Sequence, residues 1–259
     1  MIRALCVAVA LSTSLVYTTT SKAEEQTVVV KPQYSYQYSD YLADRVTAAT
    51  AQAIAEDKLL LLVLGAQWCH DSRSFSQQLS TEKLHAIVEQ HYVPVFVDVG
   101  YYRDVRWLTK QYDYPSYFAT PSVMIIDPES NTLLNMESMA MWNSAHDVSN
   151  ETYLNYFSQP EAFESASPIN QGPAFDAIRE FSQTQSDRLF AGFALVGPLL
   201  KLAKEDKLDN FDELEAVSLE VYDFRMQLQQ DIHQLYLSAQ NGSSADELIF
   251  PSYGPFSWE

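Results

Sequence analysis

Residues 59–72 read LLLLVLGAQWCHDS, and their pattern indicates the centre of the fold. The run from Leu59 to Gly65 lacks the alternation of polar and apolar residues that a half-exposed strand shows. It is typical of a strand that is covered on both faces, as in the centre of an α/β sheet. We expect a helix to begin near Cys69 and to run past Leu79. The stretch therefore predicts a buried strand that delivers Cys69 to the start of a helix.

The segments around this strand alternate between helical and extended patterns. Residues 93–100 (VPVFVDVG) predict a second buried strand, and residues 121–136 hold two apolar runs around the turn sequence DPESN, which predicts a β-hairpin. Four further segments are predicted to be helices: residues 39–58, 80–92, 104–114 and 146–157. The first two strands should be parallel because a helix connects them, whereas the hairpin adds an antiparallel element. This order predicts an α/β fold with a central mixed sheet flanked by helices.

The composition restricts the classes of function. The chain has 259 residues, a formal net charge of -18 at pH 7 and seven glycines, so a glycine-rich phosphate loop has little support. Phosphate binding needs clustered Lys and Arg, and the charge therefore argues against nucleic acid as a partner. It argues equally against an anionic membrane surface. Such acidity is explained most simply by solubility in a salty or extracytoplasmic setting.

Residues 1–23 have the pattern of a cleaved secretory signal peptide. Arg3 supplies a positive charge, residues 4–17 are an apolar run, and SKA at 21–23 fits the small-x-small pattern of a cleavage site. We therefore expect a periplasmic or secreted protein. Cleavage would remove Cys6 and leave Cys69 as a lone thiol in an oxidising compartment, where it has no partner for an internal disulfide.

Residues 158–173 are a linker by composition. They divide a domain at residues 24–157 from a helical region at residues 174–259. In the helical region, residues 173–207 predict two helices, or one helix that is broken at Gly197-Pro198.

An apolar run of fifteen residues lies inside the segment 173–207, and it is too short to predict a membrane span in the mature chain. Residues 210–240 place apolar side chains at steps of three and four, which predicts a long amphipathic helix. This helix is expected to pack on its neighbours, with a coiled-coil or partner surface as the alternative. A dimer through this helix or through Cys69 is left open.

Three segments together resemble the thioredoxin superfamily: LLLLVLGAQWCHDS at 59–72, VPVFVDVG at 93–100 and TPSVMIIDPESNTLLN at 120–135. In that family a central strand delivers a Trp-Cys-x-x-Cys motif to a helix N-terminus, opposite a Thr-Pro or similar pair with a cis peptide bond. The chain is also similar to exported bacterial thioredoxin-like proteins with Trp-Cys-His-Asp followed by Cys or Ser, and MWNSA at 141–145 fits that group. The resemblance covers residues 26–157 and implies a thioredoxin fold.

The resemblance also implies which residues form the site. Trp68 and Cys69 match the first half of the motif, which makes Cys69 the nucleophile. Thr120-Pro121 matches the cis-proline pair, where the backbone of the residue before proline binds a peptide as an added strand. Trp68, Thr120 and Pro121 are therefore the predicted substrate-binding residues.

Two departures from the family pattern concern the second half of the motif. Ser72 replaces the resolving cysteine, and Val63 stands six residues before Cys69, where the family carries a buried acid. The helix N-terminus favours a thiolate, a protonated His70 would add to this, and the Ser72 hydroxyl can donate a hydrogen bond to sulfur. Compared with the family pattern, the sequence therefore keeps the attacking thiol but lacks the internal groups that would release a mixed disulfide.

Two functions fit this pattern. One is monothiol thiol–disulfide exchange through Cys69, with Ser72 and His70 tuning the thiol, and with a protein or a small-molecule thiol as partner. This would be a thiol–disulfide oxidoreductase or isomerase-like activity. The other is a redox-silent thioredoxin-fold module that binds or assembles proteins through the fold and the C-terminal helices.

A metal or cofactor is not predicted. Cys69, His70 and Asp71 are adjacent at a helix start, where they cannot easily converge on one ion, and no Cys-x-x-Cys or His-x-x-x-His spacing is present.

Overall fold

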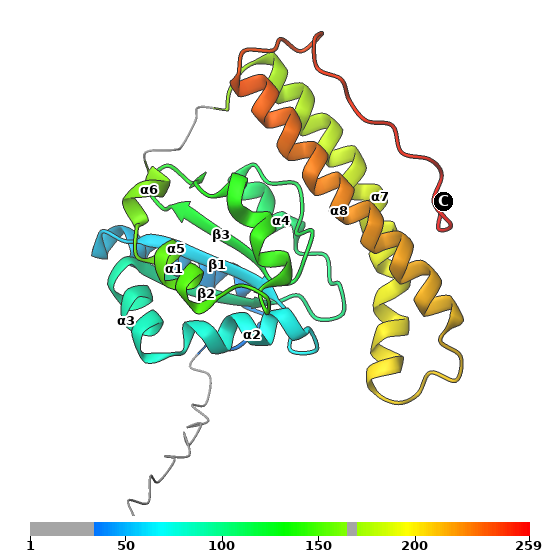
Figure 1. Ribbon diagram of the computed structural model, residues 1–259, viewed down its shortest axis with the longest axis horizontal. Coiled ribbons are helices and arrows are strands. Elements are labelled where there is room, and N and C mark those ends of the chain that lie inside the picture. The colour runs from blue at the N-terminus through cyan, green and yellow to red at the C-terminus, as the bar shows by residue number, and fades with distance from the viewer. Residues whose placement is uncertain (1–33, 165–169) are drawn as a thin grey trace, which may run out of the picture.

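The computed structural model describes residues 34–164 and 170–259 (Figure 1). The predicted signal peptide, with Cys6, lies outside these residues. The described chain forms a mixed sheet with helices on both faces, followed by a long helical hairpin (Figure 1). The predicted α/β fold with a helical C-terminal region is therefore confirmed.

The sheet has four strands in the order β2-β1-β3-β4. Their bounds are β1 Leu59–Gly65, β2 Tyr92–Asp98, β3 Ser122–Asp127 and β4 Thr132–Leu133. β1 pairs in parallel with β2 and antiparallel with β3, and β3 turns back antiparallel to β4, as the hairpin signal predicts. Every residue of β1 is buried because this strand lies between β2 and β3 and both of its faces are covered.

Two hydrophobic cores lie on the two faces of the sheet, and the side chains of β1 alternate between them. Leu60, Leu62 and Leu64 belong to one core, and the odd-numbered residues from Leu59 to Val63 belong to the other. The helices that cover the sheet include α1 Leu42–Glu56, α2 His70–Leu79, α3 Glu82–His91 and α5 Asn150–Phe157. Residues of α1 join the first core, and residues of α2, α3 and α5 join the second.

Shorter helices fill the connections. They are α4 Arg106–Thr109, the 3-10 helices η1 Lys110–Tyr112 and η2 Met136–Ser144, and α6 Pro160–Glu164. α6 lies inside the segment 158–173 that composition marks as a linker. Polar composition alone therefore does not exclude a turn of helix here.

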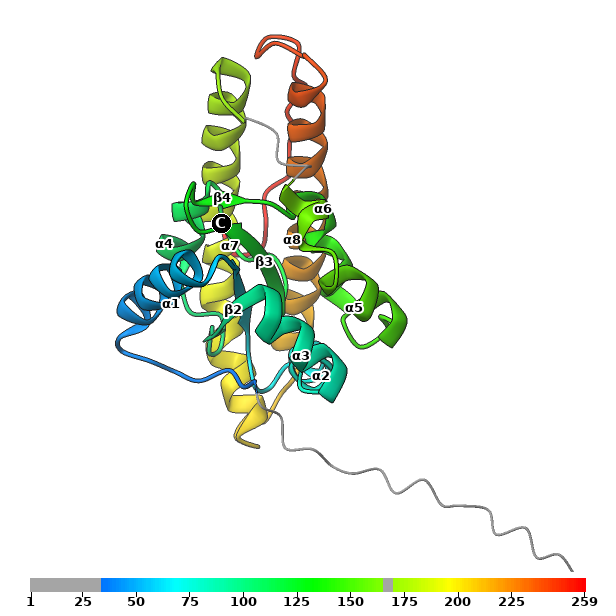
Figure 2. The same cartoon turned by 90° about the vertical axis from the view of Figure 1, so that its left-hand side faces the viewer.

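The C-terminal region is a hairpin of two helices, α7 Pro173–Lys204 and α8 Asp212–Gln240, which lie side by side in both views (Figures 1 and 2). The predicted break at Gly197-Pro198 is wrong, since α7 is one helix that contains both residues. A proline inside a helix costs about 3 kcal/mol. The packing of α7 against α8 and the sheet domain offsets this cost, because buried residues follow α7 from Phe175 to Gly197.

The amphipathic helix predicted for residues 210–240 is α8, and it packs back on α7 as expected. The chain then returns along the hairpin, where the Trp258 indole N–H donates to the Arg188 carbonyl over 3.0 Å. Across the described ranges, no helix has the length and apolar character that crossing a membrane requires.

Candidate functional site around Cys69

Cys69 lies at the start of α2, in the turn that follows β1. Its backbone is extended (φ -78°, ψ 129°), its N–H donates to the Ala66 carbonyl over 3.1 Å, and its carbonyl accepts from Arg73 in the first turn of the helix. The side chain is half-buried and unpaired with another cysteine. The fold therefore presents the thiol at a helix N-terminus, where free backbone N–H groups and the helix dipole favour negative charge.

The Thr120-Pro121 pair lies directly against the thiol. The peptide bond between these residues is cis. The Cys69 thiol donates to the Thr120 carbonyl oxygen with 2.9 Å between sulfur and oxygen. β3 begins at Ser122 and runs antiparallel to β1, which brings residues 51 positions apart in the chain into contact. The sheet therefore joins the predicted nucleophile to the predicted substrate-binding pair.

Ser72 occupies the first turn of α2 and is fully buried at 0% exposure. Its hydroxyl oxygen accepts a hydrogen bond from the Ala66 N–H over 3.3 Å. Val63 is also fully buried, in the core on the α2 side of the sheet, so this position carries no titratable group. A hydroxyl is not a thiol, and neither residue provides a group that could release a disulfide bond from Cys69.

Trp68 precedes the thiol and is anchored by the loop after β2. Its indole N–H donates to the Gly100 carbonyl over 2.7 Å, and its ring stacks on Tyr101 with 6.2 Å between centroids. Tyr102 meets Trp68 edge-on at 5.4 Å and stacks on Phe193 of α7 at 4.4 Å. A line of aromatic rings therefore connects the site to the helical hairpin.

His70 is exposed and turned toward the segment before α5. Its ring lies 4.1 Å from that of His146, edge-on, and within the described ranges no hydrogen bond joins it to the Cys69 sulfur. Asp71, beside it, accepts a hydrogen bond from the His146 backbone N–H over 3.0 Å. Asp71 thus ties α2 to the segment that leads into α5, which is a structural contact that the sequence pattern does not reveal.

Residues 42–128 match the model of a family described as thioredoxin-like. The chain carries a thioredoxin-like domain. A solved structure titled disulphide isomerase from Xylella fastidiosa Temecula1 is also similar, with 24% identity and a TM-score of 0.44, over 48% of this chain and 96% of that one. No curated protein matches the chain. The family match lies inside the predicted domain at residues 24–157 and covers β1, Cys69 and the Thr120-Pro121 pair.

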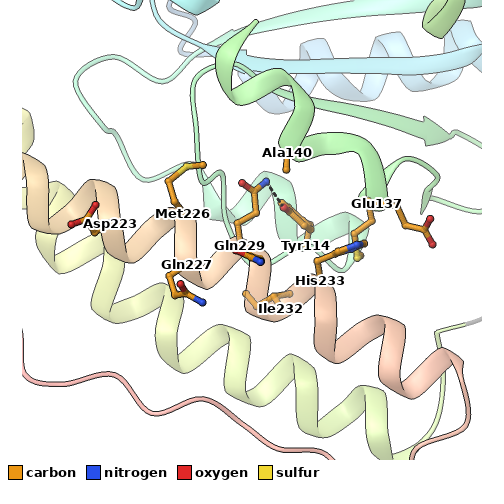
Figure 3. Close-up of a pocket in the computed structure, with 11 residues that line it drawn as sticks. Tyr114, Glu137, Ala140, Asp223, Met226, Gln227, Gln229, Ile232 and His233 are labelled. Carbon is orange, nitrogen blue, oxygen red and sulfur yellow. Dashed lines mark hydrogen bonds between the residues drawn. The ribbon is translucent and has the colours of Figure 1, made fainter. Parts of the chain in front are cut away.

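The thioredoxin-like domain has a separate pocket on its hairpin side. Figure 3 shows it between η2 and α8, with Tyr114 at its base and Met226 and His233 of α8 on its wall. Its lining, drawn from the described part of the chain, includes none of the predicted site residues. Searched over the same part of the chain, His, Cys, Asp and Glu side chains form no cluster of three that could hold a metal ion.

One residue near the thiol was missed by the sequence interpretation. Tyr36, in the polar segment before α1, has its ring buried beneath the start of α2, close to Gly65 and Ser72. The only signal for it is Gly65 itself, since a glycine at the end of a buried strand leaves room for a side chain from elsewhere.

Proposed function

We propose that the protein performs thiol–disulfide exchange with a single thiol, Cys69, acting on protein or small-molecule partners in a periplasmic or secreted setting. One observation carries the proposal: a half-exposed thiol at the N-terminus of α2 donates to the carbonyl of Thr120, the residue before a cis proline. Thiolate is the attacking species, and this location favours it. The match of residues 42–128 to a thioredoxin-like family supports the same reading.

The exchange step follows from the chemistry of one thiolate. Cys69 sulfur attacks one sulfur of the partner's disulfide, forms a mixed disulfide with it, and expels the other sulfur as a thiolate. Ser72 cannot carry out the next attack, since its hydroxyl is buried and is not a thiol. A second thiolate, from the partner or from a small molecule, must attack the mixed disulfide and regenerate Cys69. Isomerisation and glutathione-dependent exchange both meet this requirement.

Ionisation of the thiol also prepares the partner's binding site. The neutral thiol donates to the Thr120 carbonyl, and a thiolate has no proton to donate. The carbonyl is then free to accept from a backbone N–H of an extended peptide. Trp68 forms the side of the peptide-binding site next to Cys69. A hydrogen bond to Gly100 and stacking on Tyr101 hold its ring in place. Deprotonation and peptide binding therefore favour each other.

The proposal is tested by alkylation and by trapping. Iodoacetamide is added to the reduced, folded protein at neutral pH, and we expect Cys69 to react faster than the same thiol in the urea-unfolded chain, because the helix N-terminus favours the thiolate. Oxidised glutathione should form a mixed disulfide that persists until a free thiol is added, and Cys69→Ala should form none. An alkylation rate no faster than in the unfolded chain, together with no glutathione adduct, would count against thiol exchange.

The second candidate is a redox-silent binding or assembly module. A specific observation favours it: the distal part of the hairpin exposes large apolar side chains, namely Leu195, Leu202, Phe211, Leu219 and Tyr222. Such a surface suits a protein partner or a second copy of the chain. In that case Cys69→Ala would retain the full behaviour of the natural chain. A covalent dimer through Cys69 would be visible on a non-reducing gel.

A further inference from the structure

Tyr36 carries a buried hydroxyl without a partner. The residue is 2% exposed, and its segment is attached to the sheet by a bridge between Gln37 and Val97. Its ring meets Phe96 edge-on at 5.2 Å. Among the described residues, the phenol oxygen has no hydrogen-bond partner of normal geometry. A buried polar group left in this state costs free energy, so its retention calls for an explanation.

The phenol and Ser72 converge on the space above Gly65. A Cβ atom placed on Gly65 would lie 2.4 Å from Cε1 and 2.6 Å from Cζ of Tyr36, and 2.7 Å from the Ser72 hydroxyl oxygen. These distances are shorter than real Cβ contacts, and any side chain at position 65 would displace one of the two neighbours. The end of the Tyr36 ring and the Ser72 hydroxyl therefore share one small buried space beneath the start of α2.

The phenol stays protonated in this place. Burial raises the pKa of Tyr36 well above its ordinary value, the nearby Ser72 hydroxyl opposes this, and negative charge on Cys69 raises the pKa further. Tyr36 therefore remains a hydrogen-bond donor when Cys69 ionises. The other titratable groups around the thiol and the phenol are His70, Asp71, His146, Tyr102 and Tyr153.

The hydrogen-bonding capacity of Ser72 connects the two groups. A serine hydroxyl has one proton to donate and two lone pairs that accept. One lone pair of Ser72 accepts from the Ala66 N–H. The other lone pair and the proton remain available, and the unpartnered phenol lies beside them. Ser72 also stands three positions after Cys69 in the first turn of α2, a spacing that puts two side chains on the same side of a helix.

We propose that Tyr36 is a positioning residue for the thiolate: in the deprotonated state it donates to Ser72, and Ser72 donates to the Cys69 sulfur. The inference rests on the proposed function in that it concerns the same thiol. The relay completes the hydrogen bonds of Ser72 with two accepted and one donated. It also supplies the phenol with an acceptor, which the structure with the neutral thiol leaves without a partner of normal geometry.

The test compares the pH dependence of iodoacetamide alkylation in the natural chain and in Tyr36→Phe, which keeps the ring and removes the hydroxyl. We expect the midpoint to rise by about half a pH unit, which is roughly a threefold slower rate at a fixed pH below the midpoint. The melting temperature of the reduced protein should stay equal or rise, because a buried unpartnered group is removed. Ser72→Ala should raise the midpoint as well, and adding Tyr36→Phe to it should have no further effect.

Tyr34→Phe is the matched control. Tyr34 lies on the same segment and its hydroxyl bonds to His85 Nδ1 over 2.7 Å, so its removal should leave the midpoint unchanged. An unchanged midpoint in Tyr36→Phe, or shifts that add up in the double variant, would overturn the relay. If Tyr36→Phe has no effect while glutathione adducts still form, the relay is wrong and thiol exchange stands. If the midpoint shifts while the natural chain forms no adduct, the relay stands and thiol exchange is wrong.

Discussion

Replacing Phe193 with alanine should weaken the helical hairpin and the thioredoxin-like domain together. Phe193 projects from α7, is 1% exposed, and stacks on Tyr102 at 4.4 Å and on Tyr117 at 5.7 Å. Both tyrosines belong to the domain, in the connections between β2 and β3. The Phe193 ring therefore packs between the hairpin and the domain, and a cavity in its place would weaken the packing of both.

The expected magnitude follows from burial. Removing a fully buried Phe side chain costs about 3–5 kcal/mol of unfolding free energy, which combines the lost transfer energy with the cavity. Phe211, at the start of α8, is the matched control since it is 54% exposed. About half of the transfer energy of a Phe is at stake there, with no enclosed cavity, so Phe211→Ala should cost about 1 kcal/mol or less. Urea denaturation measures both values.

Hydrogen exchange then shows where the loss falls. Amides of β1 report on the domain and amides of α8 report on the hairpin. If the two units unfold as one, Phe193→Ala should lower the opening free energy of the slowest amides in both by the same amount. Unchanged protection in β1 would refute the reasoning, as would a urea result within 1 kcal/mol of that for Phe211→Ala.

Three further predictions concern single side chains. Ser72→Cys should supply a second thiol that resolves the mixed disulfide, so that glutathione adducts no longer accumulate. The control Ser76→Cys, one turn further along α2, should leave adduct formation unchanged. Mass spectrometry measures the amount of adduct in both variants. The Arg188 side chain lowers the pKa of Glu259 to about 2, from about 4.3 in an unfolded chain. The ionised Glu259 side chain contributes its full stabilisation above about pH 4.3, and this contribution is lost as the pH falls toward 2. The melting temperatures of the natural chain and of Glu259→Gln should therefore converge between these two pH values. The Asn135 side chain bonds two backbone groups of β3; Asn135→Ala leaves both buried and unpaired, and should cost roughly 2–4 kcal/mol in urea.

The elements that are predictable from sequence are those whose signal is local. The unbroken apolar run of β1 requires cover on both faces, and the turn residues between β3 and β4 require a hairpin, whatever the rest of the chain does. The parallel pairing of β1 with β2 follows because a helical crossover links them. These rules involve neighbours in the sequence or the chirality of a connection, and they hold here.

The elements that sequence misses depend on contacts between distant residues. Gly197-Pro198 predicts a helix end, yet α7 continues through both residues. Gly197 allows the helix to approach the loop after β2, since a Cβ atom there would lie 2.3 Å from the Tyr101 carbonyl oxygen. Tyr36 gives no local signal, since it lies against residues 29 and 36 positions away in the chain. In both cases a glycine leaves space for a group from a distant part of the chain, and the sequence does not show which group fills that space.

Val63 and Ser72 both bear on how a mixed disulfide is released from Cys69. A buried carboxylate at position 63 would serve to accept a proton from a second thiol at position 72. With Ser72 there is no such proton, and a charged group would be left buried near a thiolate, where desolvation and like-charge repulsion both disfavour it. Valine removes that charge, and the protonated phenol of Tyr36 offers a donor without adding another. The three residues therefore fit a site in which one thiolate attacks a partner and an outside thiol then resolves the mixed disulfide, rather than one in which an internal thiol completes the cycle.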